Sequence, residues 1–195
     1  MKNIVYKLLM PIYGIFYRLI YRPTIIGSEN IPKEGAFVIC GNHKHTRDQM
    51  NVMIVTKRVI HYMAKEEYFE GNFAWFFRLA GCIKVDRRIH DEKAKSIALD
   101  YLNNGHAGGI FPEGTRNKTI GTPEEVDLLP FKFGAVSLAK KSNAVIVPFG
   151  ISGEYTGRKG NLVCRIGKPF SVKDMELEEA NQVLREKILK LMKNK

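Results

Sequence analysis

The sequence predicts an α/β fold in which one mostly parallel sheet is flanked by helices. Short apolar runs, which are typical of buried strands, alternate along the chain with amphipathic stretches that are typical of helices. Polar, glycine-containing loops follow two of these runs, at the position where ligands bind in open α/β sheets. The 195-residue chain contains no internal repeat and no long linker, so we expect a single domain.

The composition is that of a globular protein with an anionic partner. Hydrophobic residues make up 45% of the chain and charged residues 26%, which excludes a disordered polymer. The formal net charge of +11 indicates binding to nucleic acid, anionic lipid or a phosphorylated substrate. The basic residues are spread through the chain and the aromatic residues lie in apolar stretches, which argues against nucleic-acid binding.

Residues 1–22 form the most apolar end of the chain. The uncharged run Leu8–Tyr17 is only ten residues long and contains Pro11 and Gly14, so it is too short to span a bilayer. Basic residues flank this run, aromatic residues are dense in it, and no signal-peptide cleavage site follows. The pattern favours a helix that lies in one leaflet with tyrosines at the headgroups, and the alternative is a helix packed on the protein core. We expect a membrane-interface helical anchor at 1–22 and a globular domain at 23–195.

Apolar runs predict the strands of the sheet. They lie at 24–26, 36–40, 59–64, 81–88, 108–111, 144–150 and 162–166. The run at 81–88 ends in charged residues, and the run at 24–26 ends in a glycine turn. In the run at 144–150, Pro148 indicates that the strand ends there or lies at a sheet edge.

Helices are predicted between these strands. They begin at residues 49 and 131 and cover 73–79, 91–103 and 176–193. The helix at 91–103 carries Ala94, Ile97, Ala98 and Leu102 on its apolar side. The aromatic stretch 73–79 indicates core packing, with an acyl-chain or membrane contact as the alternative. The last helix is acidic first and basic last, as the helix dipole favours.

His43 and Asp48 follow the strand at 36–40. Five residues at about 100° each place two side chains roughly 140° apart on a regular helix, so the pair can meet only across a turn. Asp48 would then fix the tautomer of His43, and His43 would take a proton from a hydroxyl group. No Gly-x-Ser-x-Gly elbow is present, so we expect that hydroxyl to belong to the substrate of a transferase.

The three cysteines are Cys40, Cys82 and Cys164, an odd number without a Cys-x-x-Cys pair. We interpret them as small buried residues in a reducing compartment. The alternative for Cys40, three residues before His43, is a nucleophilic role.

A second polar loop, 112–117, directly follows the strand at 108–111. Gly114 permits unusual backbone angles, and Arg116 offers a planar fork that matches phosphate. Lys132, at a predicted helix start, is a weaker phosphate ligand.

Four stretches together resemble the glycerolipid acyltransferase family, specifically its 1-acyl-glycerol-3-phosphate acyltransferases. They are Asn42-His43 to Asp48, the run Gly81 to Arg87, Phe111 to Arg116, and Val145 to Pro148. The resemblance covers roughly residues 25–167. His45 stands where the family commonly has Ser, and the pair of His43 and His45 has the spacing of metal ligands. No further ligand occurs at a suitable spacing, so no metal is expected.

The resemblance implies a single-domain α/β acyltransferase fold at 23–195. It implies transfer of a fatty acyl group from acyl-CoA or acyl carrier protein to lysophosphatidate, which gives phosphatidate in phospholipid biosynthesis without a cofactor. His43 would be the general base and Asp48 its partner. The implied substrate-binding residues are Arg87, Glu113, Gly114, Thr115, Arg116 and Lys132, with both arginines on the acceptor phosphate and Glu113 either positioning the glycerol or bracing its loop.

A lipid acceptor also implies a location. We expect a peripheral or monotopic protein of the cell membrane with its active site on the cytoplasmic side. Several alternatives remain open at this point: glycerol 3-phosphate or another lyso-lipid as the acceptor, a non-enzymatic membrane-binding protein on the same scaffold, and a surface ion pair of Arg87 with Asp86.

Overall fold

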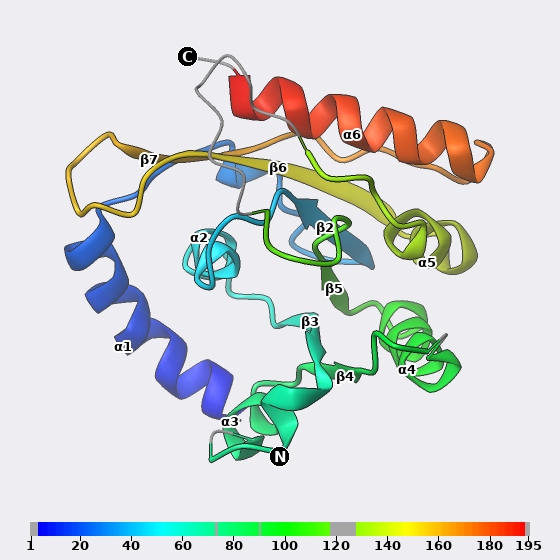
Figure 1. The fold of residues 1–195 in the computed structure, drawn as a ribbon, viewed down its shortest axis with the longest axis horizontal. Coiled ribbons are helices and arrows are strands. Elements are labelled where there is room, and N and C mark those ends of the chain that lie inside the picture. The colour runs from blue at the N-terminus through cyan, green and yellow to red at the C-terminus, as the bar shows by residue number, and fades with distance from the viewer. Residues whose placement is uncertain (1–3, 73, 90, 118–127, 194–195) are drawn as a thin grey trace.

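The computed structural model describes residues 4–72, 74–89, 91–117 and 128–193, and in these ranges it shows one sheet with helices on both faces (Figure 1). The strands of the sheet are β1 (Thr24–Ile26), β2 (Phe37–Gly41), β3 (Ile60–Lys65), β4 (Ile83–Val85), β5 (Ala107–Ile110), β6 (Val145–Gly153) and β7 (Leu162–Ile166). The α-helices are α1 (Ile4–Tyr21), α2 (Asp48–Met53), α3 (Ala74–Leu79), α4 (Glu92–Asn103), α5 (Gly134–Ser142) and α6 (Leu177–Lys193). Two 3₁₀ turns, η1 (Ser28–Asn30) and η2 (Glu66–Phe69), follow β1 and β3.

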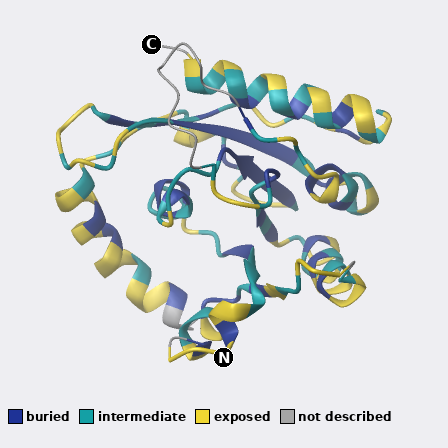
Figure 2. Cartoon of the chain, in the orientation of Figure 1, coloured by how far each residue is buried: buried dark blue, intermediate teal, exposed yellow. Residues whose placement is uncertain are grey.

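The strands lie in the order β1-β7-β6-β2-β5-β3-β4. Neighbouring strands are parallel except for β6 and β7, which are antiparallel, so the predicted mostly parallel mixed sheet is confirmed. The central strand β2 lies between β6 and β5, and each of its residues is buried (Figure 2). A parallel strand covered on both faces is apolar throughout, which is why the run at 36–40 shows no alternation.

Successive residues of β2 enter two apolar cores on opposite faces of the sheet. Val38 and Cys40 belong to the core beneath α4, α5 and α6, whereas Phe37 and Ile39 belong to the core on the α2 side. Full burial of such side chains contributes roughly 1.5–3 kcal/mol each, so both faces fix the strand that leads into His43. On β6, Gly150 lets α6 approach closely, because a Cβ there would lie 2.8 Å from the Leu191 backbone.

The prediction for Pro148 is wrong. β6 continues to Gly153 and lies inside the sheet between β7 and β2. The carbonyl of Pro148 accepts a hydrogen bond from the amide of Gly167 on the β7 side, and the missing N–H of Pro148 points to that same side. This position lies one residue before the first β6–β7 pair, Phe149 with Ile166, so the missing N–H falls at the end of that ladder and interrupts none of its pairs.

The predicted helices are present, with shifted ends. α2 begins one residue earlier than predicted, at Asp48, and the helix predicted to begin at 131 begins at Gly134. In α4, Asp91 caps the N-terminus by accepting from the amide of Ala94. The prediction for Ile97 is wrong, because its side chain is 37% exposed while the other predicted apolar residues are buried. Ile97 lies about 100° around the helix from the centre of the buried face.

Helix α1 has one side on the protein and one side exposed. Tyr6 and Tyr17 are buried against the body of the protein, so these tyrosines do not lie on the outward side where the sequence prediction placed them. The exposed side (Figure 2) is mostly apolar and carries Leu8, Leu9, Ile12, Tyr13, Ile15, Phe16, Leu19 and Ile20, with Lys7 and Arg18 also exposed. Within the described ranges, no helix is both long enough and apolar enough to cross a bilayer. Residues 1–3 of the predicted anchor, and Phe73 of the aromatic stretch, lie outside the described residues.

Candidate active site

The structure brings His43 and Asp48 into contact at the carboxyl end of β2. The chain turns sharply after Gly41, and Asp48 is the first residue of α2. His43 Nδ1 lies 2.9 Å from Asp48 Oδ2, as the turn between them predicts. The side chain of His43 is 16% exposed and that of Asp48 is 0% exposed, so only the histidine of this pair reaches solvent.

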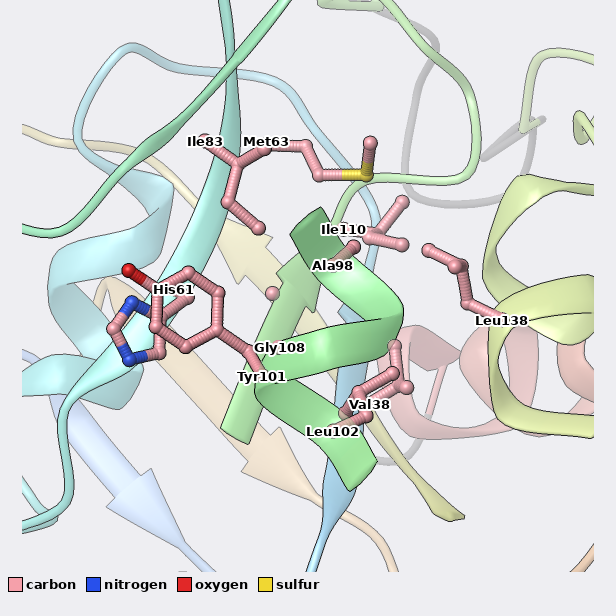
Figure 3. Close-up of a pocket in the computed structure, with 11 residues that line it drawn as sticks. Val38, His61, Met63, Ile83, Ala98, Tyr101, Leu102, Gly108, Ile110 and Leu138 are labelled. Carbon is pink, nitrogen blue, oxygen red and sulfur yellow. The ribbon is translucent and has the colours of Figure 1, made fainter. Parts of the chain in front are cut away.

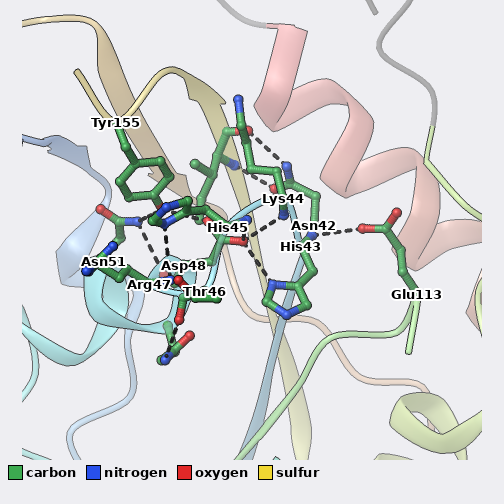
Figure 4. Close-up of polar contacts among 12 residues, drawn as sticks. Asn42, His43, Lys44, His45, Thr46, Arg47, Asp48, Asn51, Glu113 and Tyr155 are labelled. Carbon is green, nitrogen blue, oxygen red and sulfur yellow. Dashed lines mark hydrogen bonds and ion pairs between the residues drawn. The ribbon is translucent and has the colours of Figure 1, made fainter. Parts of the chain in front are cut away.

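Asp48 is held by several donors, which fixes the tautomer of His43 (Figure 4). Oδ2 also accepts from the backbone amides of Lys44 and His45, each at 2.7 Å, and Oδ1 accepts from the Tyr155 hydroxyl at 2.6 Å. An ionised carboxylate only accepts hydrogen bonds, so Nδ1 of His43 carries the proton and donates. The lone pair on Nε2 is thereby available to take a proton from a hydroxyl group.

The His43 loop is anchored to its neighbours in the sheet. Asn42, which is 3% exposed, exchanges two hydrogen bonds with the backbone of Ile151 on β6, at 2.9 and 2.7 Å. The ring of His43 stacks on Phe111 with 4.0 Å between ring centroids and 14° between planes. These contacts leave the imidazole little freedom to rotate before a substrate arrives.

The second predicted loop lies beside the first because β5 is the neighbour of β2 in the sheet and runs parallel to it. The two loops are tied directly, since the amide of Asn117 donates to the carbonyl of His43 at 2.6 Å. Glu113 makes a second tie. Its Oε1 accepts from the amide of His43 at 2.8 Å, and its Oε2 accepts from the amide of Leu129 at 2.9 Å.

Of the two roles left open for Glu113, the geometry supports bracing of the loops. The residue is 4% exposed, its Oε1 accepts from the amide of His43 (Figure 4), and its Oε2 accepts from the amide of Leu129. Burial raises the pKa of the Glu113 carboxyl, while the bonds from the His43 and Leu129 amides act in the opposite direction. Glu113 therefore couples the position of the His43 backbone to the segment that leads into α5.

Arg87, Gly114 and Lys132 meet on the outer side of the second loop. The guanidinium of Arg87 donates to the carbonyl of Gly114. Gly114 has a φ of 71°, so the backbone conformation favours glycine here, and the end of the Lys132 side chain lies 3.0 Å from where a Cβ would be. Asp86, the alternative partner of Arg87, pairs with Arg88 at 2.9 Å, and this pairing lowers the pKa of Asp86 to about 2.

Arg116 and Thr115 complete the loop and are both exposed. Burial lowers the pKa of His45, and the positive charges of Arg47, Arg116 and Lys44 act in the same direction, while the charge of Asp48 opposes them. Positive charge therefore lies near His45, in the same loop as the His43–Asp48 pair. All the residues predicted for catalysis or substrate binding lie in or beside these two loops.

Two alternatives from the sequence can now be judged. Cys40 is 0% exposed in the core beneath α4 to α6, and burial raises the pKa of its thiol, so a nucleophilic role for it has no structural support. In the pair of His43 and His45, the Nδ1 of His45 accepts from the amide of Arg47 at 3.3 Å, and its ring stacks on Tyr155. The described ranges contain no group of three or more His, Cys, Asp or Glu side chains placed to hold a metal ion.

A small cavity on the opposite face of the sheet is not the site (Figure 3). It lies between the sheet and α4, and its lining is largely apolar, including Val38, Met63, Ile83 and Ile110. His61, stacked on Tyr101 at 3.7 Å between ring centroids, closes one end. None of the predicted catalytic or substrate-binding residues lines this cavity.

Sequence reasoning missed Tyr155 and Asn51. Tyr155 lies 107 positions from Asp48, which it reaches because β6 and β2 are neighbours. The signal available in the sequence was the position of Tyr155 shortly after the apolar run 144–150. The carboxyl ends of parallel strands meet at one edge of a sheet, so a side chain after this strand can reach the loop after another.

Comparison with known proteins agrees with this geometry. Residues 22–152 match the family model described as Acyltransferase. The chain is 31% identical over 156 residues to the 1-acyl-sn-glycerol-3-phosphate acyltransferase of Bacillus subtilis, covering 77% of this chain and 74% of that protein. It is 29% identical over 175 residues to the Saccharomyces cerevisiae protein of the same name, covering 81% of this chain and 54% of the relative.

A solved structure shows the same fold. The crystal structure of the 1-acyl-sn-glycerophosphate acyltransferase PlsC from Thermotoga maritima superposes with a TM-score of 0.74 and 25% identity, covering 93% of this chain and 76% of that one. The family model spans both loops and the His43–Asp48 pair. This chain therefore belongs to the acyltransferase family.

Proposed function

We propose that this protein transfers a fatty acyl group from a thioester to the free hydroxyl of 1-acylglycerol 3-phosphate, which yields phosphatidate. The observation that carries the proposal is the His43–Asp48 contact, which leaves Nε2 of His43 available, with the exposed Arg116 in the neighbouring loop. The names of the Bacillus subtilis and Saccharomyces cerevisiae relatives and of the Thermotoga maritima structure support this acceptor.

The chemistry follows from the geometry of the pair. Nε2 of His43 takes the proton of the acceptor hydroxyl while the hydroxyl oxygen attacks the thioester carbonyl carbon. The new C–O bond forms, the C–S bond breaks, and the imidazolium returns its proton to the departing thiolate. Asp48 stabilises the imidazolium, because its buried carboxylate lies 2.9 Å from Nδ1. Backbone amides of the two loops are the expected donors to the oxyanion.

The second loop supplies the proposed site for the acceptor phosphate. Arg116 is exposed and presents a planar fork, so it makes the principal contact. Arg87 and Lys132 flank Gly114 and add positive charge there, while Thr115 offers a hydroxyl. Glu113 acts indirectly, by fixing the backbone that carries these groups.

The acyl donor is either acyl-CoA or an acylated carrier protein, since both are anionic and the net charge of +11 suits both. The thioester already activates the carbonyl carbon, so we infer that no cofactor takes part. Glycerol 3-phosphate and other lyso-lipids are the alternative acceptors, because they offer the same hydroxyl and phosphate chemistry.

The direct test is an acyl-transfer assay on the purified protein. Lysophosphatidate and glycerol 3-phosphate are each offered with acyl-CoA and with acylated carrier protein. We expect phosphatidate from lysophosphatidate, and its loss in His43→Ala, with circular dichroism confirming that the variant is folded. A folded wild-type protein that binds lipid but transfers no acyl group in any combination would instead support the non-enzymatic membrane-binding alternative.

We also propose that 1–22 is a membrane-interface anchor and that the protein is a peripheral or monotopic protein of the cell membrane, with its site facing the cytoplasm. The exposed apolar side of α1 supports this, and exposed Trp75 and Leu79 on α3 extend it, since α3 packs against α1. Such a surface is costly in water and favourable at a headgroup interface.

A surface substitution tests the anchor without disturbing the buried tyrosines. Leu8→Ser combined with Ile15→Ser changes only exposed side chains, at 64% and 61% exposure. We expect binding to anionic liposomes in a sedimentation assay to fall at least about tenfold with little change in Tm. Ile97→Ser, an exposed apolar residue on α4, is the matched control. Unchanged sedimentation of the double variant would exclude α1 as the anchor.

A further inference from the structure

The carboxylate of Asp48 has a half-buried partner outside the two loops, Tyr155. The Tyr155 hydroxyl donates to Oδ1 at 2.6 Å, whereas Oδ2 is shared by His43 and two backbone amides. Asp48 is 0% exposed, so water does not replace a lost donor. Removal of the Tyr155 hydroxyl would therefore take from a buried, charged oxygen the protein donor that satisfies it.

The Tyr155 hydroxyl is itself held by a chain of hydrogen bonds (Figure 4). Nδ2 of Asn51 donates to the Tyr155 oxygen at 3.0 Å, and Oδ1 of Asn51 accepts from the Tyr17 hydroxyl at 3.0 Å. Since Asn51 donates to that oxygen, the Tyr155 proton is directed to Asp48. Asn51 and Tyr17 are 0% and 1% exposed and Tyr155 is half-buried, so the chain of hydrogen bonds runs from α1 through α2 to the catalytic pair.

The ring of Tyr155 is fixed independently of its hydroxyl. It stacks on His45 with 4.1 Å between centroids and meets the edge of Tyr21 at 5.5 Å. Burial and the charge of Asp48 raise the pKa of Tyr155, which keeps the hydroxyl protonated as a donor. A phenylalanine at this position would keep both ring contacts and lose only the hydrogen bonds.

We propose that Tyr155 is a positioning residue for the His43–Asp48 pair and that Asn51 and Tyr17 set its hydroxyl. This inference rests on the proposed acyl transfer. By holding Oδ1, Tyr155 fixes the rotation of the carboxylate, so that Oδ2 faces Nδ1 of His43. Its hydroxyl acts through Asp48 and leaves the exposed cations of the second loop unchanged, so it governs turnover without affecting substrate affinity.

The first test is steady-state kinetics of Tyr155→Phe. We expect kcat to fall about 10- to 100-fold, with both KM values within about twofold of wild type.

Two further variants bracket this result. Tyr17→Phe removes a hydroxyl one step farther along the chain, so we expect a smaller loss of kcat, about two- to fivefold, in the same direction. Tyr62→Phe is the matched control, since its hydroxyl is buried and has no hydrogen-bond partner among the described residues. Its kcat is expected to stay within about twofold of wild type. An unchanged kcat in Tyr155→Phe, or a rise in KM in place of a fall in kcat, overturns the proposal.

A stability cycle tests the same inference without any acyl transfer. Urea unfolding is measured for wild type, Tyr155→Phe, Asp48→Asn and the double variant. We expect Tyr155→Phe to lower the urea midpoint clearly in the wild-type background and much less beside Asp48→Asn, where no charge needs the hydroxyl. Equal losses in both backgrounds overturn the positioning role. A wild type that transfers no acyl group disproves the proposed function, and this cycle still decides whether Tyr155 holds Asp48.

Discussion

The loop after β2 and the loop after β5 lie side by side at one edge of the sheet, yet they are built differently. In the first, the side chains that would move the proton are pinned, with Asp48 held by two amides and a hydroxyl and His43 stacked on Phe111. In the second, Glu113 is buried but Arg116 and Thr115 are exposed. The difference indicates a division of labour in which the catalytic geometry is set in advance while the binding groups remain open to the substrate.

Asp48→Asn is expected to have the largest effect, because it acts on the pinned loop. The new side chain must turn either its oxygen or its NH₂ group toward the backbone amides of Lys44 and His45. The tautomer of His43 is then no longer fixed. We expect kcat for acyl transfer to fall about 10⁴-fold with KM nearly unchanged. A loss smaller than about tenfold would show that the bonded carboxylate is not what prepares His43.

Glu113→Gln tests whether the bracing residue belongs with the pinned groups. One of its two backbone amide partners would then face the NH₂ group of the new side chain, which cannot accept a hydrogen bond. We expect kcat to fall about 10- to 100-fold and Tm to drop, since a buried donor is left unsatisfied. If the acceptor KM rose instead, with kcat and Tm unchanged, Glu113 would be a substrate contact.

Arg116→Lys tests the loop after β5, because the substitution keeps the positive charge and removes the planar fork. We expect the KM for the phosphorylated acceptor to rise about tenfold, while kcat and the donor KM change by less than about threefold. Arg87→Lys provides a comparison, because its guanidinium is engaged with the Gly114 carbonyl and its loss should disturb the loop itself. Acceptor KM values equal to wild type in Arg116→Lys would place that side chain outside the phosphate site.

The smallest effect on activity is expected for a substitution of His61. This buried histidine lies outside both loops, beside the cavity under α4. Its Nδ1 bonds to the carbonyl of Gly81, and burial lowers its pKa below the ordinary value of 6.5. A group with a depressed folded-state pKa binds fewer protons folded than unfolded, so stability is full above about pH 6.5 and declines as pH falls toward the folded value.

The expected slope for His61 is at most about 1.4 kcal/mol per pH unit, the limit for one proton. His61→Gln should flatten the dependence of Tm on pH between about 7 and 5 while leaving kcat at neutral pH close to wild type. A variant with the same pH dependence of Tm as wild type would assign the acid sensitivity to another group.

The sequence alone was enough for the sheet and for the two loops. The run 36–40 is continuously apolar and 162–166 is bounded by polar residues, so local pattern sufficed to predict β2 and β7. The five-residue spacing of His43 and Asp48 requires a turn, which the structure shows. The prediction for Pro148 was wrong, because local pattern does not show where β7 begins to pair with β6. That position determines whether the missing N–H of the proline interrupts the ladder of hydrogen bonds.

Tertiary structure alone decided which distant residues share the site. Nothing local links Tyr155 to Asp48, since the contact depends on β6 lying beside β2. The same holds for α1, where sequence composition predicts an apolar interfacial helix but cannot tell its buried side, with Tyr6 and Tyr17, from its exposed side. Hydrophobic periodicity shows which side of a segment can be buried. The element that covers that side, and the hydrogen bonds made there, are fixed only when all the strands take their order in the sheet.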